Sequence, residues 1–193
     1  SICTTRQVSG TGVPQMTAIY SVYRALRDAG VTDVPVIADG GIRTSGDVVK
    51  ALSVGAAAVM LGSVLAGTDE SPGRTVQRGN KLYRVYRGMG SHAAMTERSG
   101  SRARYNALDS TQPTERLTAK QGEKVVAEGV EGLVEAKGPV ENVVAQLHGG
   151  VACGLAHTGA RTIDDFQRTA ALWRQSQAGV VEGRPHTVID PSK

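Results

Sequence analysis

Aromatic residues and cysteines are scarce in this 193-residue sequence, and it has no long apolar run. Aromatics make up 4% of the residues, so a buried core has to be built from Val, Leu, Ile and Ala. The two cysteines, Cys3 and Cys153, do not indicate a disulfide framework and favour a reducing cytoplasm. No apolar stretch approaches the roughly 20 residues of a membrane span, which argues against an integral membrane protein.

Basic side chains outnumber acidic ones without forming a basic run. The 22 Lys and Arg against 18 Asp and Glu give a formal net charge of +4. No Lys/Arg-rich segment is interleaved with aromatics, so nucleic acid is disfavoured as a partner. The same charge balance suits a small phosphorylated or nucleotide substrate.

A predicted strand–helix–strand unit organises the sequence. The apolar run Val34–Ala38 predicts a fully buried strand, and Ala56–Leu61 predicts a second one. The segment between them, Thr44–Val54, has the pattern of a helix with polar residues at its start and a glycine just beyond its end. This order is typical of a parallel βαβ unit and places the sequence in the α/β class.

Both predicted strands end in small or acidic residues that suit a ligand. The first is followed by Asp39, Gly40 and Gly41, and the second by Gly62 and Ser63. The carboxyl ends of parallel strands meet at one edge, where free amides near glycines can cradle a phosphate. A strand-end acid either caps a nearby amide or binds sugar hydroxyls, and the neighbouring glycines favour the second role for Asp39.

Apolar spacing and turn residues predict the remaining elements. Helices are expected at Gln15–Ala29, Pro139–Leu147, Ala152–His157 and Thr162–Ser176. A hairpin is expected from Thr75–Gln77 and Leu82–Tyr86, extended chain at Val125–Lys137 and a loop at Ser1–Thr11. In the last helix, Phe166, Ala170 and Trp173 would pack along one face.

Two further segments show no sustained hydrophobic period. Residues 92–124 are polar and basic, which is typical either of a solvated loop or of a mobile flap over an active site. Residues 180–193 predict a docked or partly ordered tail. Because a closed (β/α)₈ barrel needs eight strands and only two strong parallel candidates occur, we expect the sequence to be the C-terminal part of a larger protein.

Cys3 stands beside Thr4, Thr5 and Arg6. A lone cysteine is usually a small buried hydrophobe. Hydroxyls and a guanidinium nearby favour a thiolate instead, and therefore a nucleophile. The local sequence leaves both interpretations open.

Six short segments together resemble the inosine 5′-monophosphate (IMP) dehydrogenase family. They are SICTTR at 1–6, GVPQ at 12–15, IADGG at 37–41, MLGSVLAGTDESPG at 60–73, YRGMGS at 86–91 and EGVEG at 128–132. Each is weak alone, but their joint order and spacing are specific. The resemblance implies that residues 1–193 are the C-terminal part of one catalytic TIM (β/α)₈ barrel, with the two predicted strands as its seventh and eighth. The N-terminal half of the barrel would lie outside this sequence.

The resemblance implies NAD-dependent oxidation of IMP to xanthosine monophosphate (XMP), with Cys3 attacking C2 of the base. It assigns the phosphate to Ser1, Gly41, Gly62, Ser63 and Tyr86, the ribose to Asp39, and the base to Met89, Gly90 and Glu128. Arg104 and Tyr105 match the family's flap pair, which would activate the hydrolytic water. Since an arginine normally stays protonated, Thr5 with Glu128 offers a second proton route.

The resemblance also implies a potassium ion and an oligomer. Backbone carbonyls of Cys3, Glu182, Gly183 and Arg184 would hold the ion, as rings of carbonyl oxygens do for potassium elsewhere. A site shared between subunits implies a homotetramer.

Two alternatives stay open. Guanosine monophosphate (GMP) reductase shares the barrel, the CTTR-type loop and the nucleotide site but lacks the Arg–Tyr flap, so Arg104, Tyr105 and residues 12–15 favour the dehydrogenase. The second alternative is a nucleotide-binding homologue without catalytic activity. The joint presence of Cys3, Thr5, Arg104 and Glu128 argues against this alternative.

Overall fold

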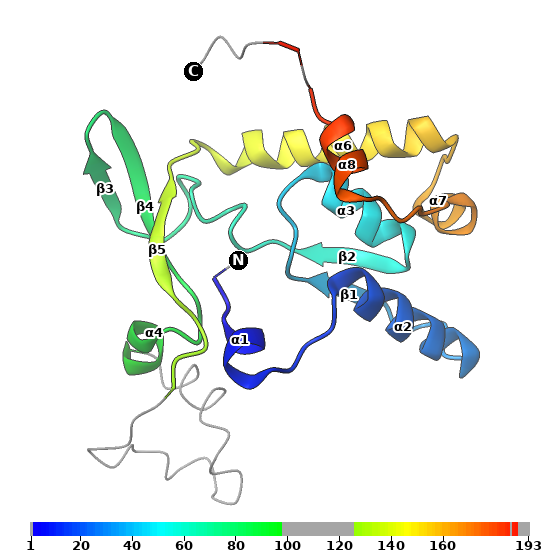
Figure 1. The fold of residues 1–193 in the computed structure, drawn as a ribbon, viewed down its shortest axis with the longest axis horizontal. Helices are drawn as coiled ribbons and strands as arrows, with labels where there is room; N and C mark the ends of the chain where they lie inside the picture. The colour runs from blue at the N-terminus through cyan, green and yellow to red at the C-terminus, as the bar shows by residue number, and fades with distance from the viewer. Residues whose placement is uncertain (1, 98–125, 186, 189–193) are drawn as a thin grey trace, which may run out of the picture.

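The computed structural model describes residues 2–97, 126–185, 187 and 188, which form two small sheets and their helices (Figure 1). Helices α2, α3, α6 and α7 gather around the parallel pair β1–β2, and the antiparallel sheet β3–β4–β5 extends to the other side. The N-terminal segment lies between the two sheets. Arg104 and Tyr105 of the predicted flap, and Ser1, fall outside the described residues.

The predicted βαβ unit is confirmed. Strand β1 (Val36–Asp39) pairs in parallel with β2 (Ala56–Met60), and α3 (Ser45–Ser53) connects them. Thr44 Oγ1 accepts a hydrogen bond from the Asp47 amide at 3.3 Å, and Asp47 Oδ2 accepts one from the Thr44 amide at 3.1 Å. This capping box starts α3 and so fixes where the crossover begins.

The expectation that the first strand is fully buried is wrong. Ala38 is buried, but Ile37 is 57% and Val34 54% exposed. Within the described residues β1 pairs only with β2, and the exposure of Ile37 and Met60 shows that one face of the pair is largely uncovered. The core lies on the other face, between β1, β2, α2 (Gln15–Asp28), α3 and Phe166. The α/β class is therefore established, whereas the closed barrel remains a prediction.

Helix α6 (Val140–Thr158) runs through Gly149 and Gly150, where the sequence predicted a break between two helices. A Cβ at Gly150 would overlap the Ser45 side chain, and one at Gly154 would lie 2.7 Å from Val49 Cγ2. These glycines let α6 approach α3 closely, so they serve packing rather than helix termination.

The C-terminal helix is shorter than predicted. Helix α7 covers Ile163–Thr169, and Ala170 has extended backbone with ψ 131°. Phe166 is buried at 2% exposure, but Trp173 is 90% exposed, because the helical period that would bring it to the core ends before it. A separate helix, α8 (Gln177–Glu182), follows the N-cap residue Ser176 and includes the first residues of the predicted tail.

The predicted hairpin is confirmed and gains a third strand. Strands β3 (Thr75–Arg78) and β4 (Lys81–Arg87) pair antiparallel, and β5 (Glu131–Glu135) pairs with β4. Two segments expected to be irregular contain short helices: α1 (Thr5–Ser9) and α4 (His92–Glu97). Helix α4 forms because Ser91 Oγ accepts from the Ala94 amide at 3.3 Å and because Ala94 and Met95 are buried. No helix of the described part is both long and apolar enough to cross a bilayer.

Candidate functional site

The carboxyl ends of β1 and β2 lie side by side, as the sequence predicted. Asp39 is paired in register with Met60, so the Asp39–Gly41 turn and the Gly62–Ser63 turn follow at the same edge. Gly40 and Gly41 have φ of +100° and +77°, a backbone conformation that is unfavourable for residues with a Cβ. The Asp39 side chain is exposed at this edge, where it can bind a ligand.

Gln15 anchors this edge, a role that the sequence did not reveal. Its Nε2 donates to the carbonyl oxygen of Asp39 at 2.8 Å. A Cβ at Gly41 would lie 3.9 Å from Gln15 Cβ. In the sequence Gln15 was the first residue of a predicted helix and the last of the GVPQ segment, and because its contact spans 24 residues, neither pattern indicated its partner.

Tyr86 of β4 reaches across to the Gly62 turn. A Cβ at Gly62 would lie 3.1 Å from the Tyr86 hydroxyl oxygen, so the phenol lies directly above this glycine. Burial raises the pKa of Tyr86 above its ordinary value, which keeps the hydroxyl protonated and able to donate. The structure therefore brings together two of the residues assigned to the phosphate, although they come from different sheets.

Cys3 is held by a ladder of backbone hydrogen bonds that joins three distant segments. The Thr4 amide donates to the Glu128 carbonyl at 2.8 Å, and the Val130 amide donates to the Ile2 carbonyl at 2.9 Å. On its other side, the Glu128 amide donates to the Gly90 carbonyl at 2.9 Å. Segment 128–130 thus lies between segment 2–4 and segment 88–90.

Two glycines make this ladder possible. A Cβ at Gly129 would lie 3.0 Å from the Ser91 amide nitrogen, and one at Gly88 would lie 3.2 Å from the Ile2 carbonyl oxygen. Both distances are shorter than ordinary contacts of a side chain. The close packing of the three segments therefore requires glycine at positions 88 and 129. This packing brings Cys3 near Glu128 and Met89–Gly90.

Cys3 is a free, exposed cysteine whose thiol donates to Thr5 Oγ1 at 3.2 Å. The interpretation of Cys3 as a buried hydrophobe is therefore wrong. Thr5 is the first residue of α1, so this hydrogen bond connects the thiol to the helix. The other free cysteine, Cys153, is on α6 and takes no part in the ladder.

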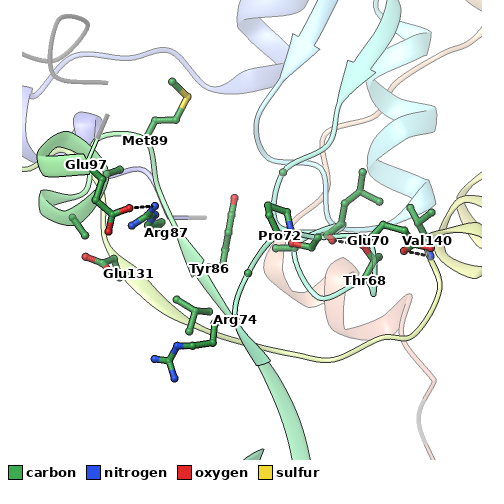
Figure 2. A pocket seen from close by; sticks show the side chains of 18 residues that line it. Thr68, Glu70, Pro72, Arg74, Tyr86, Arg87, Met89, Glu97, Glu131 and Val140 are labelled. Atoms are coloured by element: carbon green, nitrogen blue, oxygen red, sulfur yellow. Dashed lines mark hydrogen bonds and ion pairs between the residues drawn. The ribbon is translucent and has the colours of Figure 1, made fainter. Parts of the chain in front are cut away.

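A cavity of about 810 Å³ lies next to these residues and is bordered by Gly62, Tyr86 and Met89 (Figure 2). Figure 2 shows Tyr86 pointing into the space between Arg87 and Pro72, with Arg87 paired to Glu97 at 2.6 Å. Neither Cys3 nor Asp39 lines this cavity. It therefore adjoins the arrangement around the thiol and is not the space above it.

The carbonyl groups assigned to potassium lie at two places. Glu182 ends α8, and Gly183 and Arg184 follow it as exposed residues. Their carbonyl oxygens accept no hydrogen bond from the described part of the chain, as expected at a helix C-terminus, so they are available as cation ligands. No hydrogen bond connects them to the segment around Cys3 within residues 2–97 and 126–185.

The chain matches the model of one protein family along nearly its whole length. The matched residues are 1–186, and the family is described as the IMP dehydrogenase / GMP reductase domain. Inosine-5′-monophosphate dehydrogenases of Thermoplasma acidophilum and Aquifex aeolicus are each 48% identical over 188 residues, which is 97% of this chain. The chain spans 35% of the length of each of these relatives.

A solved structure is similar over the same range. A GMP reductase variant of Trypanosoma brucei in complex with guanosine 5′-monophosphate has a TM-score of 0.78 and 42% sequence identity to this chain. The similarity covers 98% of this chain and 35% of that one. The family match, the relatives and this structure agree with the six motifs, and the chain belongs to the IMP dehydrogenase/GMP reductase domain family.

Proposed function

We propose that this chain carries the nucleotide site and the attacking cysteine of an IMP dehydrogenase, which oxidises IMP to XMP with NAD. The observation that carries the proposal is the backbone ladder, because it sets an exposed thiol beside the Glu128 and Met89–Gly90 segments. The identity of about 48% to IMP dehydrogenases supports the same function.

The nucleotide would lie across the shared edge of β1 and β2. Its phosphate would be held by Ser1, Gly41, Gly62, Ser63 and Tyr86, and Asp39 would accept hydrogen bonds from the ribose hydroxyls. Support for this placement comes from the Tyr86 hydroxyl above Gly62 and from the exposed Asp39 carboxylate at the same edge. The base would then extend toward Met89, Gly90 and Glu128, on the side where Cys3 is fixed.

The chemistry proposed for Cys3 is covalent. Its thiolate adds to C2 of the hypoxanthine ring, and the hydrogen at C2 leaves with its electron pair as hydride, which gives a cysteine-bound purine. Water then adds to C2, the carbon–sulfur bond breaks, and XMP, the thiolate and a proton are released. The hydroxyl of Thr5, 3.2 Å from the sulfur, is placed to orient the thiol before attack.

NAD, when bound, accepts the hydride. The exposed thiol of Cys3 fits this role, since it is accessible to a bound nucleotide from solvent. For potassium, the carbonyl oxygens of Glu182, Gly183 and Arg184 fit as donors, with the Cys3 carbonyl as a further one. Because these two groups come from separate parts of the chain, we propose that the ion is shared between subunits of a homotetramer.

Water activation is assigned to two routes. One uses Arg104 and Tyr105 of a flap that closes after the hydride has left, and the other uses Thr5 with Glu128. The second is supported by the bond from the Thr4 amide to the Glu128 carbonyl, which keeps the two residues in adjacent segments. We further propose that the chain is the C-terminal part of a cytoplasmic (β/α)₈ barrel enzyme, with β1 and β2 as strands seven and eight.

A direct assay tests the proposal. The complete natural polypeptide, supplied with IMP and NAD, should form NADH and XMP in equal amounts. The Cys3→Ala variant should form neither while still binding IMP, because the nucleotide contacts are left in place. Turnover that survives in Cys3→Ala would contradict covalent catalysis, and absent turnover in the natural protein would contradict the dehydrogenase assignment.

GMP reductase is the second candidate, favoured by the structural similarity to the GMP-bound reductase. In that reaction GMP and NADPH give IMP, ammonia and NADP, with the same cysteine attacking C2. Consumption of NADPH with GMP, together with ammonia release, would select the reductase. Formation of NADH from IMP would select the dehydrogenase.

A further inference from the structure

The turn that follows β2 presents three backbone amides without a partner. Leu65 N donates to the Gly62 carbonyl at 3.0 Å, and Ala66 N donates to the Ser63 carbonyl at 3.4 Å, which closes the turn. The amides of Gly62, Ser63 and Val64 donate to no other residue that the structure describes. Consecutive free amides in a turn form a concave site for an anion.

Lys137, two residues beyond the end of β5, contacts this turn. Its Nζ donates to the Val64 carbonyl oxygen at 3.0 Å, although the two residues are 73 positions apart. Since the nitrogen and oxygen of one residue are at most about 3.6 Å apart, Nζ lies within about 7 Å of the Val64 amide nitrogen. That separation is shorter than the Debye length of about 8 Å at physiological ionic strength.

The backbone around Lys137 is fixed as well. The Lys137 amide donates to the Gly67 carbonyl at 2.8 Å, and the Asp69 amide donates to the Gly138 carbonyl at 3.0 Å. A Cβ at Gly67 would overlap the carbonyl oxygen of Glu135, so the turn and the end of β5 are in direct contact. The backbone that carries the Lys137 side chain is thus held against the turn.

The acidic side chains near Lys137 are bonded to other groups. Glu135 pairs with Lys81 at 2.8 Å, and Asp69 pairs with Arg84 at 3.3 Å. Glu70 Oε2 accepts from the Val140 amide at 2.9 Å. The Lys137 ammonium has no carboxylate partner in the described part of the chain, so its charge is not neutralised there.

We propose that Lys137 is a positioning residue of the phosphate subsite. It holds the Val64 carbonyl so that the amides of Gly62, Ser63 and Val64 stay directed at the anion, and its ammonium adds positive charge beside them. This inference rests on the proposed function, because it takes the anion to be the 5′-phosphate of a purine nucleotide.

Binding of IMP and of inosine to the complete natural polypeptide, measured by calorimetry at two salt concentrations, tests the role. Lys137→Met should weaken IMP binding roughly ten- to a hundredfold, the effect of losing a charged hydrogen bond, and should leave inosine binding unchanged. It should also reduce the salt dependence of IMP binding. Lys137→Arg, which keeps the charge and the donor, should restore most of the affinity. Lys81→Met is the matched control, a lysine of β4 that pairs with Glu135 and does not contact the turn after β2, and it should behave as the natural protein.

A second measurement tests the role of Lys137 even if Lys137→Met folds poorly. In the natural protein, inorganic phosphate should slow hydrogen exchange at the Ser63 and Val64 amides, and Lys137→Arg should preserve this protection. Equal weakening of IMP and inosine by Lys137→Met, no weakening of either, or no protection by phosphate would overturn the role of Lys137. If the natural protein binds IMP no better than inosine, the proposed function itself fails together with this inference.

Discussion

Single side chains fix the geometry of the nucleotide edge. The Asp39–Gly41 turn has two glycines with positive φ, and Gln15 is the residue whose side chain ties it to the rest of the chain. Because the glycines restrict the backbone little, this hydrogen bond, together with the pairing of Asp39 with Met60, helps to hold the backbone that carries the Asp39 carboxylate.

We expect Gln15→Met to weaken IMP binding by roughly two- to tenfold, the effect of one neutral hydrogen bond. The loss should be smaller for 2′-deoxy-IMP, because the change acts through the carboxylate that binds the ribose. Titration of the two nucleotides measures the difference. Gln77→Met removes a similar bond from a glutamine side chain to a carbonyl, at Gly79, and serves as the control. Equal losses for both nucleotides would contradict a role through Asp39.

The Tyr86 hydroxyl should act as a neutral donor. Tyr86→Phe is expected to weaken IMP binding by roughly ten- to a hundredfold, the effect of losing a hydrogen bond to a charged phosphate, and to leave inosine binding unchanged, whereas Tyr83→Phe on the same strand should change neither. Burial raises the pKa of Tyr86 above the ordinary 10.0, so any stability tied to its proton is fully present below pH 10. That stability is lost only as the pH rises through the higher folded-state pKa. Ultraviolet titration of the tyrosines, natural protein against Tyr86→Phe, checks the direction.

At the level of elements, α3 depends on its capping box and α6 on its glycines. Thr44 and Asp47 satisfy amides at the start of α3, and Lys50 pairs with Asp47 at 3.1 Å. Partial burial works against ionisation of Asp47, but Lys50 and the amides of Arg43 and Thr44 outweigh it and lower the pKa of Asp47. The helix that joins the two strands is thus stabilised by an ionised carboxylate.

Thr44→Ala should lower the free energy of unfolding by about 1 kcal/mol. The contribution of Asp47 should be present above pH 3.8 and lost as the pH falls through its lower folded-state pKa. Urea unfolding of the natural protein, Thr44→Ala and Asp47→Asn between pH 2 and 7 measures the two contributions to the free energy of unfolding. A difference between the two proteins that stays constant over this range would contradict the lowered pKa.

The glycines of α6 offer a matched comparison. On helix propensity alone, Gly→Ala stabilises by up to about 1 kcal/mol. We expect that gain for Gly149→Ala, where a Cβ meets nothing within 4 Å. Gly154→Ala should instead destabilise by roughly 1–3 kcal/mol, because its Cβ would lie 2.7 Å from Val49 Cγ2. Equal effects of the two substitutions in thermal unfolding would contradict the close packing of α6 on α3.

For the molecule as a whole, the uncovered face of β1 and β2 matters most. Val34, Ile37 and Met60 are each more than half exposed on or beside these strands. A parallel pair normally has both faces covered. We expect residues 1–193 expressed alone to bind a hydrophobic dye such as ANS and to show no IMP oxidation. Dye fluorescence and the NADH assay test this, and an active, dye-free preparation would contradict it.

The sequence by itself determined the local elements and the family. The βαβ unit, the hairpin and the order of the six motifs depend on residues close together in the chain, where apolar period, caps and glycines act directly. Contacts between distant segments were decided only by the tertiary structure: Gln15 on Asp39, Lys137 on Val64 and Tyr86 above Gly62. The same reason explains the errors at Gly149–Gly150 and Trp173. Whether a glycine ends a helix or lets another helix approach, and whether an apolar residue is covered, depends on neighbours that local sequence does not specify.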